Sequence, residues 1–265
     1  MELHNLSVIK AILKKHNLWA KKYLGQNFLI NKEVLDQIVE TANLQKTDQI
    51  IEIGPGLGIL TQELVRKANH VITIELDTNL SSILKENFKE YKNLTILNQN
   101  ALQFNPQIKN YKVVANIPYN ITSPVINLFL QTENKPTTMT LLVQKEVAEK
   151  ICTLEPDMTV LSLQVALFGQ AKLIKKVSAA SFYPTPKVDS AILHINLYQK
   201  TDPNYIPTDN ALEILKIAKQ AFSQRRKKLS NTLSEYKTAM QKANIDPNRR
   251  PETLAVKEWQ LLKNL

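Results

Sequence analysis

Glycine is scarce in this 265-residue sequence. It has five, whereas average usage of about 7% would give roughly 18. Three of the five occur together in the window Gly54-Pro55-Gly56-Leu57-Gly58. Glycine permits backbone conformations and close approaches that a side chain would obstruct. A chain so poor in glycine does not use three of them together for flexibility, so we expect a ligand-binding site at this window.

Cysteine is almost absent, since Cys152 is the only one. A single cysteine excludes an internal disulfide framework and a zinc site built from clustered cysteines. This usage fits a reducing compartment. The four histidines show no metal-ligand spacing, so we expect no metal.

Long apolar runs are also missing. The longest uncharged run, residues 113–132, is interrupted by asparagines and two prolines, so we expect no transmembrane span and no membrane partner. The N-terminus lacks the apolar segment and small-residue cleavage site of a secretion signal, which favours a cytoplasmic location. With 43% hydrophobic and 22% charged residues, the chain has the composition of a folded protein.

Positive charge is distributed unevenly. The net charge is +10, but residues 1–22 contain five lysines and one acid, and residues 216–250 contain ten Lys and Arg and two acids. Two basic segments around a nearly neutral body predict a polyanionic partner larger than a nucleotide. For the N-terminal lysines, a solvated surface is the alternative. In the run Arg225-Arg226-Lys227-Lys228, arginine forks suit phosphate, so we expect these four residues to contact phosphates of that partner.

Strand-like and helical segments alternate up to residue 197, which predicts a mostly parallel sheet of about seven strands with helices on both faces. The expected strands cover residues 49–53, 70–74, 94–97, 112–115, 137–143, 172–177 and 190–197. The expected helices cover residues 57–67, 79–91 and 158–168, with another beginning near 144.

The pattern changes after Tyr198, where prolines interrupt the chain and only helical periodicity follows. We expect helices over residues 211–222, 227–242 and 252–265. The predicted organisation is therefore a basic N-terminal segment (1–22), an α/β domain (23–200) and a small all-helical domain (205–265).

The glycine window lies between an expected strand and an expected helix, as in nucleotide-binding turns, where helix N-terminal amides face the ligand. Glu75 ends the next strand, where an acid can bind ribose hydroxyls. A dinucleotide fingerprint would need glycine at Ile59, and the absence of a following GK[ST] excludes a P-loop. The pattern Glu-x-Gly-x-Gly-x-Gly from Glu52 is instead the signature of S-adenosylmethionine-dependent methyltransferases. A tight turn without a ligand is the alternative.

The segment Asn116-Ile117-Pro118-Tyr119 follows the fourth strand. The exocyclic amine of adenine is a poor nucleophile, and two hydrogen-bond acceptors would draw its lone pair out of the ring. The Asn116 side-chain oxygen and the Pro118 carbonyl can serve, while Tyr119 stacks on the base, a contact worth about 1–3 kcal/mol. Methyl transfer then needs mainly alignment, on a base that is unpaired or flipped. The alternative is a proline turn that closes a strand.

A second loop contributes further candidates. Phe182 precedes the proline-stiffened segment 184–190 and is predicted to close the other face of the base. A phenylalanine of the core is the alternative. Lys187, in the same loop, is a further candidate contact for the polyanionic partner.

Together these motifs resemble the ribosomal RNA adenine N(6)-dimethyltransferase family of the KsgA/RsmA type, over nearly the whole chain. The segments that carry the resemblance, in order, are residues 25–29, 52–61, 75–77, 116–120, 142–147, 182–190, 221–227 and 250–254. It implies a Rossmann-like class I methyltransferase sheet followed by a helical RNA-binding domain. It also implies S-adenosylmethionine as cofactor, bound by Gln26, Asn27, Leu29, Glu52, Gly54, Gly56, Gly58, Glu75, Asn100 and Asn116.

The resemblance further implies the substrate. It predicts dimethylation of two adjacent adenines in the 3′-terminal hairpin loop of 16S (small-subunit) rRNA. The partner would be an immature small subunit late in its biogenesis, and the enzyme a monomer. One position departs from the family, which usually has aspartate where this chain has Asn100. The amide oxygen of Asn100 can still accept a hydrogen bond from the adenine of the donor, so we expect weakened or unchanged donor binding.

Three other functions remain open. An antibiotic-resistance methyltransferase that acts on large-subunit rRNA shares the donor and Asn-Pro-Tyr motifs, but residues 144–147, 224–228 and Ser123-Pro124 favour the small-subunit enzyme. A non-catalytic ribosome assembly factor with the same fold is less compatible with two intact motifs. A mitochondrial homologue that acts in transcription is the third alternative.

Overall fold

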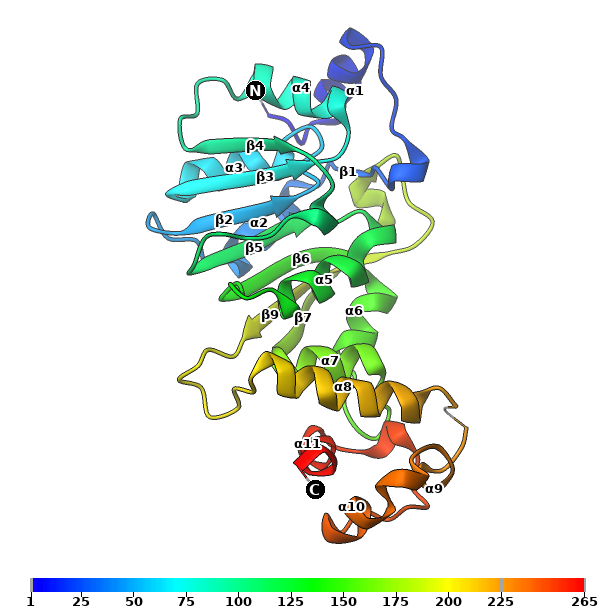
Figure 1. Cartoon of the computed structure of the whole chain (residues 1–265). Coiled ribbons are helices and arrows are strands. Elements are labelled where there is room, and N and C mark those ends of the chain that lie inside the picture. The colour runs from blue at the N-terminus through cyan, green and yellow to red at the C-terminus, as the bar shows by residue number, and fades with distance from the viewer. Residues whose placement is uncertain (1, 225, 265) are drawn as a thin grey trace. The chain divides into compact units, whose positions relative to one another are not determined.

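The computed structural model describes residues 2–224 and 226–264, and Figure 1 shows its elements. A seven-stranded sheet has the order β4-β3-β2-β5-β6-β9-β7. Strands β4, β3, β2, β5 and β6 are parallel neighbours, and β9 runs antiparallel to β6. The predicted, mostly parallel sheet is therefore confirmed. Its strands are β2 (Gln49–Ile53), β3 (His70–Glu75), β4 (Leu94–Asn98), β5 (Tyr111–Asn116), β6 (Thr138–Gln144), β7 (Gly169–Val177) and β9 (Ser190–Leu197).

The chain divides into two compact units. The sheet unit comprises Met1–Ala148 and Lys172–Leu197, and the helical unit comprises Glu149–Ala171 and Tyr198–Leu265. The boundaries thus differ from those expected, because residues 149–171 group with the C-terminal helices rather than with the sheet. The reason is helix α7 (Val160–Phe168), whose apolar surface packs against α8 (Thr208–Phe222) and α11 (Val256–Asn264).

Parallel pairing brings the ends of three strands to one edge of the sheet. Residue Ile51 of β2 is in register with Ile72 of β3 and with Val113 of β5. The glycine window after β2, Glu75 at the end of β3 and Asn116 at the end of β5 therefore lie at the same carboxyl edge. Ligands of open α/β sheets bind at this edge.

The helices of the sheet unit differ in how well the sequence predicted them. Helix α4 begins after Asp77, whose carboxylate accepts a hydrogen bond from the backbone N–H of Asn79, and ends at Asn87 rather than at residue 91. Helices α1, α2 and α5 were not predicted, although Asn31 caps α2 by accepting from the Val34 N–H. The helices are α1 (Leu6–Lys15), α2 (Lys32–Thr41), α3 (Ile59–Lys67), α4 (Thr78–Asn87) and α5 (Thr122–Gln131), and α6 (Lys145–Cys152) crosses the unit boundary.

Short elements complete the sheet unit. A two-stranded antiparallel sheet pairs β1 (Phe28–Leu29) with β8 (Phe182–Tyr183), and Leu29 lies opposite Phe182. This pairing, which the sequence did not predict, joins the N-terminal motif to the start of the proline-rich loop. Four single turns of 3-10 helix are η1 (Lys22–Leu24), η2 (Ala101–Gln103), η3 (Tyr119–Ile121) and η4 (Ala179–Ser181).

Gly58 precedes α3 with a left-handed backbone, at φ 86°. A Cβ atom at this position would lie 2.4 Å from the Phe88 ring, far inside van der Waals contact. The third glycine of the window therefore allows α3 to begin and Phe88 to pack against it.

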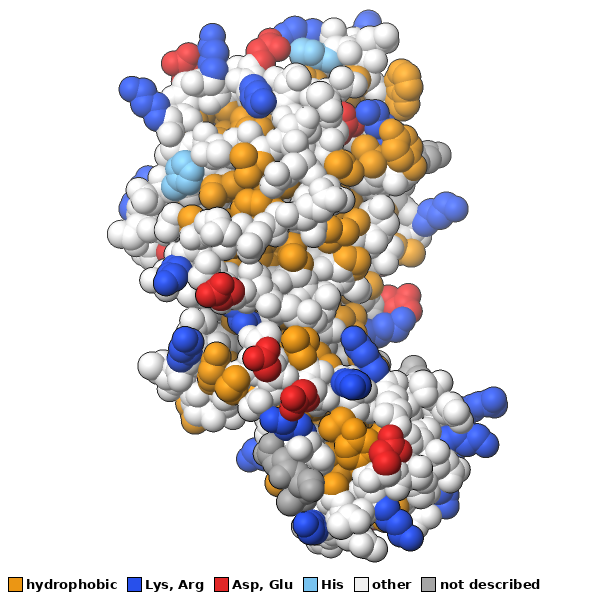
Figure 2. Space-filling view, viewed as in Figure 1, with side chains coloured by type: hydrophobic (Ala, Val, Ile, Leu, Met, Phe, Trp, Pro, Cys, Tyr) orange, Lys and Arg blue, Asp and Glu red, His pale blue; other side chains and the backbone are white. Residues whose placement is uncertain are grey.

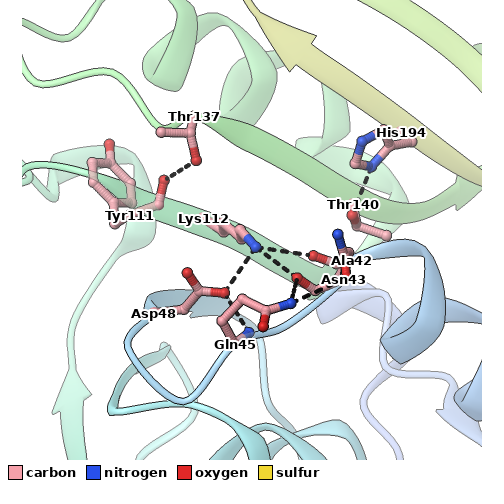
Figure 3. A network of polar contacts seen from close by, with 9 residues as sticks. All are labelled: Ala42, Asn43, Gln45, Asp48, Tyr111, Lys112, Thr137, Thr140 and His194. Atoms are coloured by element: carbon pink, nitrogen blue, oxygen red, sulfur yellow. Dashed lines mark hydrogen bonds and ion pairs between the residues drawn. The ribbon is translucent and has the colours of Figure 1, made fainter.

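Lys112 anchors the opposite edge of the sheet, where the strands begin (Figure 3). Its ammonium group donates to the Asn43 carbonyl and pairs with the Asp48 carboxylate, both at 2.8 Å. These contacts tie the end of α2 and the start of β2 to β5. Between β6 and β9, the Thr140 hydroxyl lies 2.9 Å from Nδ1 of His194, whose pKa burial lowers. Both contacts lie away from the carboxyl edge and serve the structure.

The helical unit packs around aromatic side chains. Trp259 is fully buried and stacks on Phe222 with ring centroids 6.0 Å apart. The expected helix over residues 227–242 is wrong as a single element, because the backbone leaves helical geometry at the buried Leu233 (φ −128°, ψ 44°). Serine, threonine and asparagine around it compete for backbone hydrogen bonds. The resulting elements are α9 (Leu229–Thr232), η5 (Ser234–Tyr236) and α10 (Lys237–Lys242), followed by η6 (Pro251–Thr253) before α11.

Among the helices of residues 2–224 and 226–264, none is both long and apolar enough to cross a membrane.

Candidate active site

A cavity opens at the carboxyl edge of β2, β3 and β5 in the sheet unit. The described residues that line it include no lysine, arginine or histidine. All the predicted cofactor residues except Gly58 line it: Gln26, Asn27, Leu29, Glu52, Gly54, Gly56, Glu75, Asn100 and Asn116. Pro118 and Tyr119 line the same cavity, so the predicted donor and adenine motifs share one site.

Two glycines let three loops meet at Pro118. Gly54 has φ 64°, and a Cβ there would lie 3.1 Å from Cδ of Pro118. Gly25 has φ 67°, and a Cβ there would lie 3.3 Å from Cβ of Pro118. Any other residue would strain the backbone and separate the loops. The scarce glycines therefore close the N-terminal motif, the glycine window and the Asn116-to-Tyr119 segment around one cavity.

Glu75 is buried at the end of β3 with both carboxylate oxygens oriented by backbone donors. Oε2 accepts from the Gly56 N–H at 3.0 Å, and Oε1 accepts from the Asp77 N–H at 2.8 Å. Burial raises the pKa of this carboxyl, while these hydrogen bonds oppose the rise. Each oxygen keeps a further lone pair, so the group can accept from a ligand hydroxyl.

Glu52 is 1% exposed at the penultimate position of β2. Its Oε2 accepts a hydrogen bond from the Thr61 hydroxyl at 2.7 Å. Burial raises its pKa to about 8; the Thr61 bond opposes this rise and nearby Glu75 adds to it. The cavity wall thus contains two buried carboxyl groups.

Asp77 holds the N-terminal segment over this edge. Its Oδ2 pairs with the Lys21 ammonium at 2.8 Å and accepts from the Gln26 amide at 3.0 Å, and the Lys21 N–H donates to the Gln26 oxygen at 2.8 Å. Burial alone would raise the pKa of Asp77, but the bonds from Lys21 and Gln26 outweigh it and lower the pKa. Gln26 therefore uses both ends of its amide to fix the segment. The sequence counted Lys21 among the cations of the basic N-terminal segment and placed Asp77 in a motif shared with the family, but it predicted no contact between them.

Asn116 is oriented by the N-terminal motif. Its Nδ2 donates to the Asn27 carbonyl at 3.2 Å, and a carbonyl can only accept. The amide nitrogen must therefore face Asn27, which leaves Oδ1 as the acceptor for a ligand. The Pro118 carbonyl accepts from the Ile121 N–H at 3.1 Å and retains a second lone pair.

The two aromatic candidates lie in different environments. Tyr119 is half-buried in the cavity wall, and its hydroxyl lies 2.7 Å from Oγ of Ser190, a residue to which the sequence assigned no role. Phe182 is 1% exposed and packs in the core instead of lining the cavity, because β8 pairs with β1 and directs this side chain inward. Phe182 thus belongs to the core in this structure, and its contact with the target base stays a prediction.

Asn100 lines the cavity where the family usually has aspartate. Its Oδ1 accepts from the Leu102 N–H at 2.9 Å and so caps η2. The same oxygen can accept one further bond, so weakened or unchanged donor binding stays the prediction.

The predicted RNA-binding residues that the structure describes lie at the surface. Arg226, Lys227 and Lys228 are exposed between α8 and α9, Lys187 is exposed in the sheet unit, and Arg225 is the residue outside the description. Figure 2 shows lysine and arginine side chains over the surface formed by α9 and α10, with few acidic ones. The exposed cations there are Arg226, Lys227, Lys228, Lys237, Lys242 and Arg250. Arg249 differs, since its guanidinium is held by Glu258 and Thr253.

No group of three or more metal-ligating side chains occurs within the described part of the chain. The polar side chains that line the cavity are carboxyl, amide and phenol groups, and the rest of the lining is apolar.

Known proteins resemble this chain over nearly its full length. Residues 16–265 match the family model described as ribosomal RNA adenine dimethylase. Ribosomal RNA small subunit methyltransferase A from Dehalococcoides mccartyi is 40% identical, over 96% of this chain and 90% of its own length. The protein of the same name from Clostridium botulinum is also 40% identical, over 94% of this chain and 95% of its own length.

Two solved structures share the fold. The 23S rRNA methyltransferase ErmE has a TM-score of 0.74 at 25% identity, covering 90% of this chain and 98% of its own. A dimethyladenosine transferase from Plasmodium falciparum has a TM-score of 0.72 at 26% identity, covering 89% of this chain and 95% of its own.

Proposed function

The chain belongs to the ribosomal RNA adenine dimethylase family, and from this premise we propose that it dimethylates the N6 amines of two adjacent adenines in the 3′-terminal hairpin loop of small-subunit rRNA. The enzyme is an S-adenosylmethionine-dependent rRNA adenine dimethyltransferase. The observation that carries the proposal is that Glu75, at the end of β3, and the Asn116-to-Tyr119 segment line one and the same cavity.

The chemistry of the cavity fits S-adenosylmethionine. A cavity wall with carboxyl and amide groups and no described basic side chain suits a ligand with a cationic sulfonium, and a bound cation would favour the ionised form of these carboxyl groups. Glu75 would hold ribose hydroxyls and Asn100 the adenine amine of the donor, while Asn27 and Leu29 would cover it. When bound, this cofactor supplies an electrophilic methyl group.

The residues of the chain hold the target amine. Oδ1 of Asn116 and the Pro118 carbonyl accept hydrogen bonds from the N6 hydrogens, which draws the amine lone pair out of the adenine ring. Tyr119 stacks on the base and fixes its plane. The reaction needs alignment more than a strong base. The two acceptors align the amine because Asn27 holds the Asn116 amide and the Ile121 N–H holds the Pro118 carbonyl.

We place the substrate within an immature small subunit, late in biogenesis, and the enzyme in the cytoplasm. The names of the 40% identical relatives support the small subunit as the target. One chain supplies both the donor residues and the adenine-binding residues to the same cavity, which supports a monomer. The likeness to ErmE keeps a large-subunit target as the second candidate.

The test of this function is methylation mapping. The enzyme is incubated with labelled methyl donor and either immature small subunits or naked large-subunit RNA, and the modified adenines are located. We expect two adjacent dimethylated adenines near the 3′ end of the small-subunit RNA. Incorporation only into large-subunit RNA would overturn the proposal and favour the second candidate.

Charge reversal in the basic run tests the RNA surface. We expect Arg225→Glu with Arg226→Glu to reduce the slope of log affinity for RNA against log salt by about 1 to 2, because each lost phosphate contact removes about one released counterion. Binding is measured across a salt series.

The matched control is Lys67→Glu with Lys109→Glu. Both lysines are exposed and precede strands at the opposite edge of the sheet. An equal change of slope in the control pair, or no change in the arginine pair, would remove the basic run from the interface.

A further inference from the structure

A buried serine contacts the tyrosine of the adenine-binding segment. Oγ of Ser190 lies 2.7 Å from the Tyr119 hydroxyl. Ser190 is completely buried, whereas Tyr119 is half-buried and lines the cavity. The bond therefore joins a fixed interior point to a side chain that faces the ligand.

The backbone around Ser190 is firmly held. Ser190 begins β9 and is in register with Gln144 of β6. The preceding residue, Asp189, accepts from the Lys145 N–H through its carbonyl and from the Ala179 N–H through its carboxylate, both at 3.0 Å. The serine hydroxyl thus projects from a strand end that is fixed on both sides.

Such a bond controls the orientation of the aromatic ring. A tyrosine in a cavity wall can rotate about its side-chain torsions, and stacking on a base requires one ring plane. A hydrogen bond at the far end of the ring fixes the position of the hydroxyl, and so it selects the rotamer that projects the ring toward the base before the base arrives. Burial raises the pKa of Tyr119, so its hydroxyl keeps its proton and can donate to the serine oxygen.

We propose that Ser190 is a positioning residue for methyl transfer, which holds the Tyr119 side chain in the rotamer from which its ring stacks on the target adenine. The proposal rests on the function proposed above. It gives a role to the last residue of the proline-rich loop, and it explains why a serine hydroxyl is buried beside a tyrosine of the site. A serine that only satisfied a buried polar group would have no effect on how the base stacks.

A double-mutant cycle tests the proposal. Ser190→Ala and Tyr119→Phe each remove the bond, while the second keeps the stacking ring. We expect each to lower kcat about 3- to 10-fold, the effect of one neutral hydrogen bond, and the double variant to be no slower than either. The affinity for the methyl donor should stay unchanged in all three, because neither hydroxyl belongs to the donor residues.

A stacking readout separates positioning from general stability. An RNA with 2-aminopurine at the target adenine is fluorescent, and its quenching on binding measures stacking. We expect weaker quenching with Ser190→Ala and with Tyr119→Phe. The control is Ser181→Ala, another buried serine, whose hydroxyl accepts from Asn31 outside the cavity. It should leave kcat and quenching unchanged, whatever it does to thermal stability.

The outcomes are distinct. Effects that multiply in the double variant, or wild-type quenching in Ser190→Ala, would overturn the proposal. If Ser190→Ala does not fold, wild-type kcat and quenching in Tyr119→Phe would overturn it as well. Failure of the wild-type enzyme to methylate adenine in small-subunit RNA would instead contradict the proposed function. The two failures are distinguishable because the double-mutant cycle measures the kcat of each variant relative to that of the wild-type enzyme.

Discussion

Replacing Asn116 with alanine is expected to lower kcat for methyl transfer by about 10²- to 10³-fold, the usual cost of removing one preorganised hydrogen-bonding group from an active site. The variant loses the Oδ1 acceptor that holds the target amine. It also loses the Nδ2 bond to the Asn27 carbonyl, so the N-terminal motif becomes less well fixed. Donor affinity should therefore fall as well, but by much less than kcat.

Single-turnover rates at saturating donor, together with calorimetric donor affinity, separate these two effects. Asn93→Ala is the matched control, because the Asn93 amide also donates to a backbone carbonyl, that of Val65 at 2.9 Å, but at the edge where β4 begins. It should cost stability without changing kcat. A kcat for Asn116→Ala within about threefold of wild type would remove the amine-holding role, since one lost hydrogen bond of ordinary strength already accounts for that much.

The order of strands and motifs along the chain was enough to predict much of this site. The glycine window, Glu75 and Asn116 each follow an apolar run read as a strand, and parallel strands end at one edge. Their convergence on one cavity follows from that topology without knowledge of any contact. Local patterns also predicted which segments are strands, because buried strands of a parallel sheet are continuous apolar runs.

Contacts between distant segments were beyond such prediction. The bond from Lys21 to Asp77, and the pairing of Leu29 with Phe182, join short segments that have no periodicity of their own. For the same reason the sequence left two positions open for Phe182, beside the base or in the core. Leu233 illustrates another limit, because the helix breaks there inside a segment whose charges and apolar residues fit one continuous helix.

Replacing Glu52 with glutamine is expected to stabilise the protein at alkaline pH and to have little effect in acid. Burial raises the pKa of Glu52 to about 8 in the folded state, from an ordinary value of 4.5. Between these values the folded state binds more protons than the unfolded state, so the free energy of unfolding falls as pH rises. The favourable contribution of the neutral acid is complete below about pH 4.5 and is lost as pH rises through about 8.

Glutamine has the same shape, remains neutral and can still accept from the Thr61 hydroxyl. At pH 8.5 we expect the variant to be more stable than the wild type by up to about 5 kcal/mol, because each pKa unit corresponds to about 1.4 kcal/mol. Denaturant unfolding from pH 5 to 9 measures the difference. Glu86→Gln is the control, since Glu86 is exposed, pairs with Lys15 and has a lowered pKa. Glu86→Gln should show no gain in stability at high pH. If the free energies of unfolding of Glu52→Gln and wild type differ by the same amount at every pH, the prediction is wrong, because this carboxyl is then already charged in the cavity.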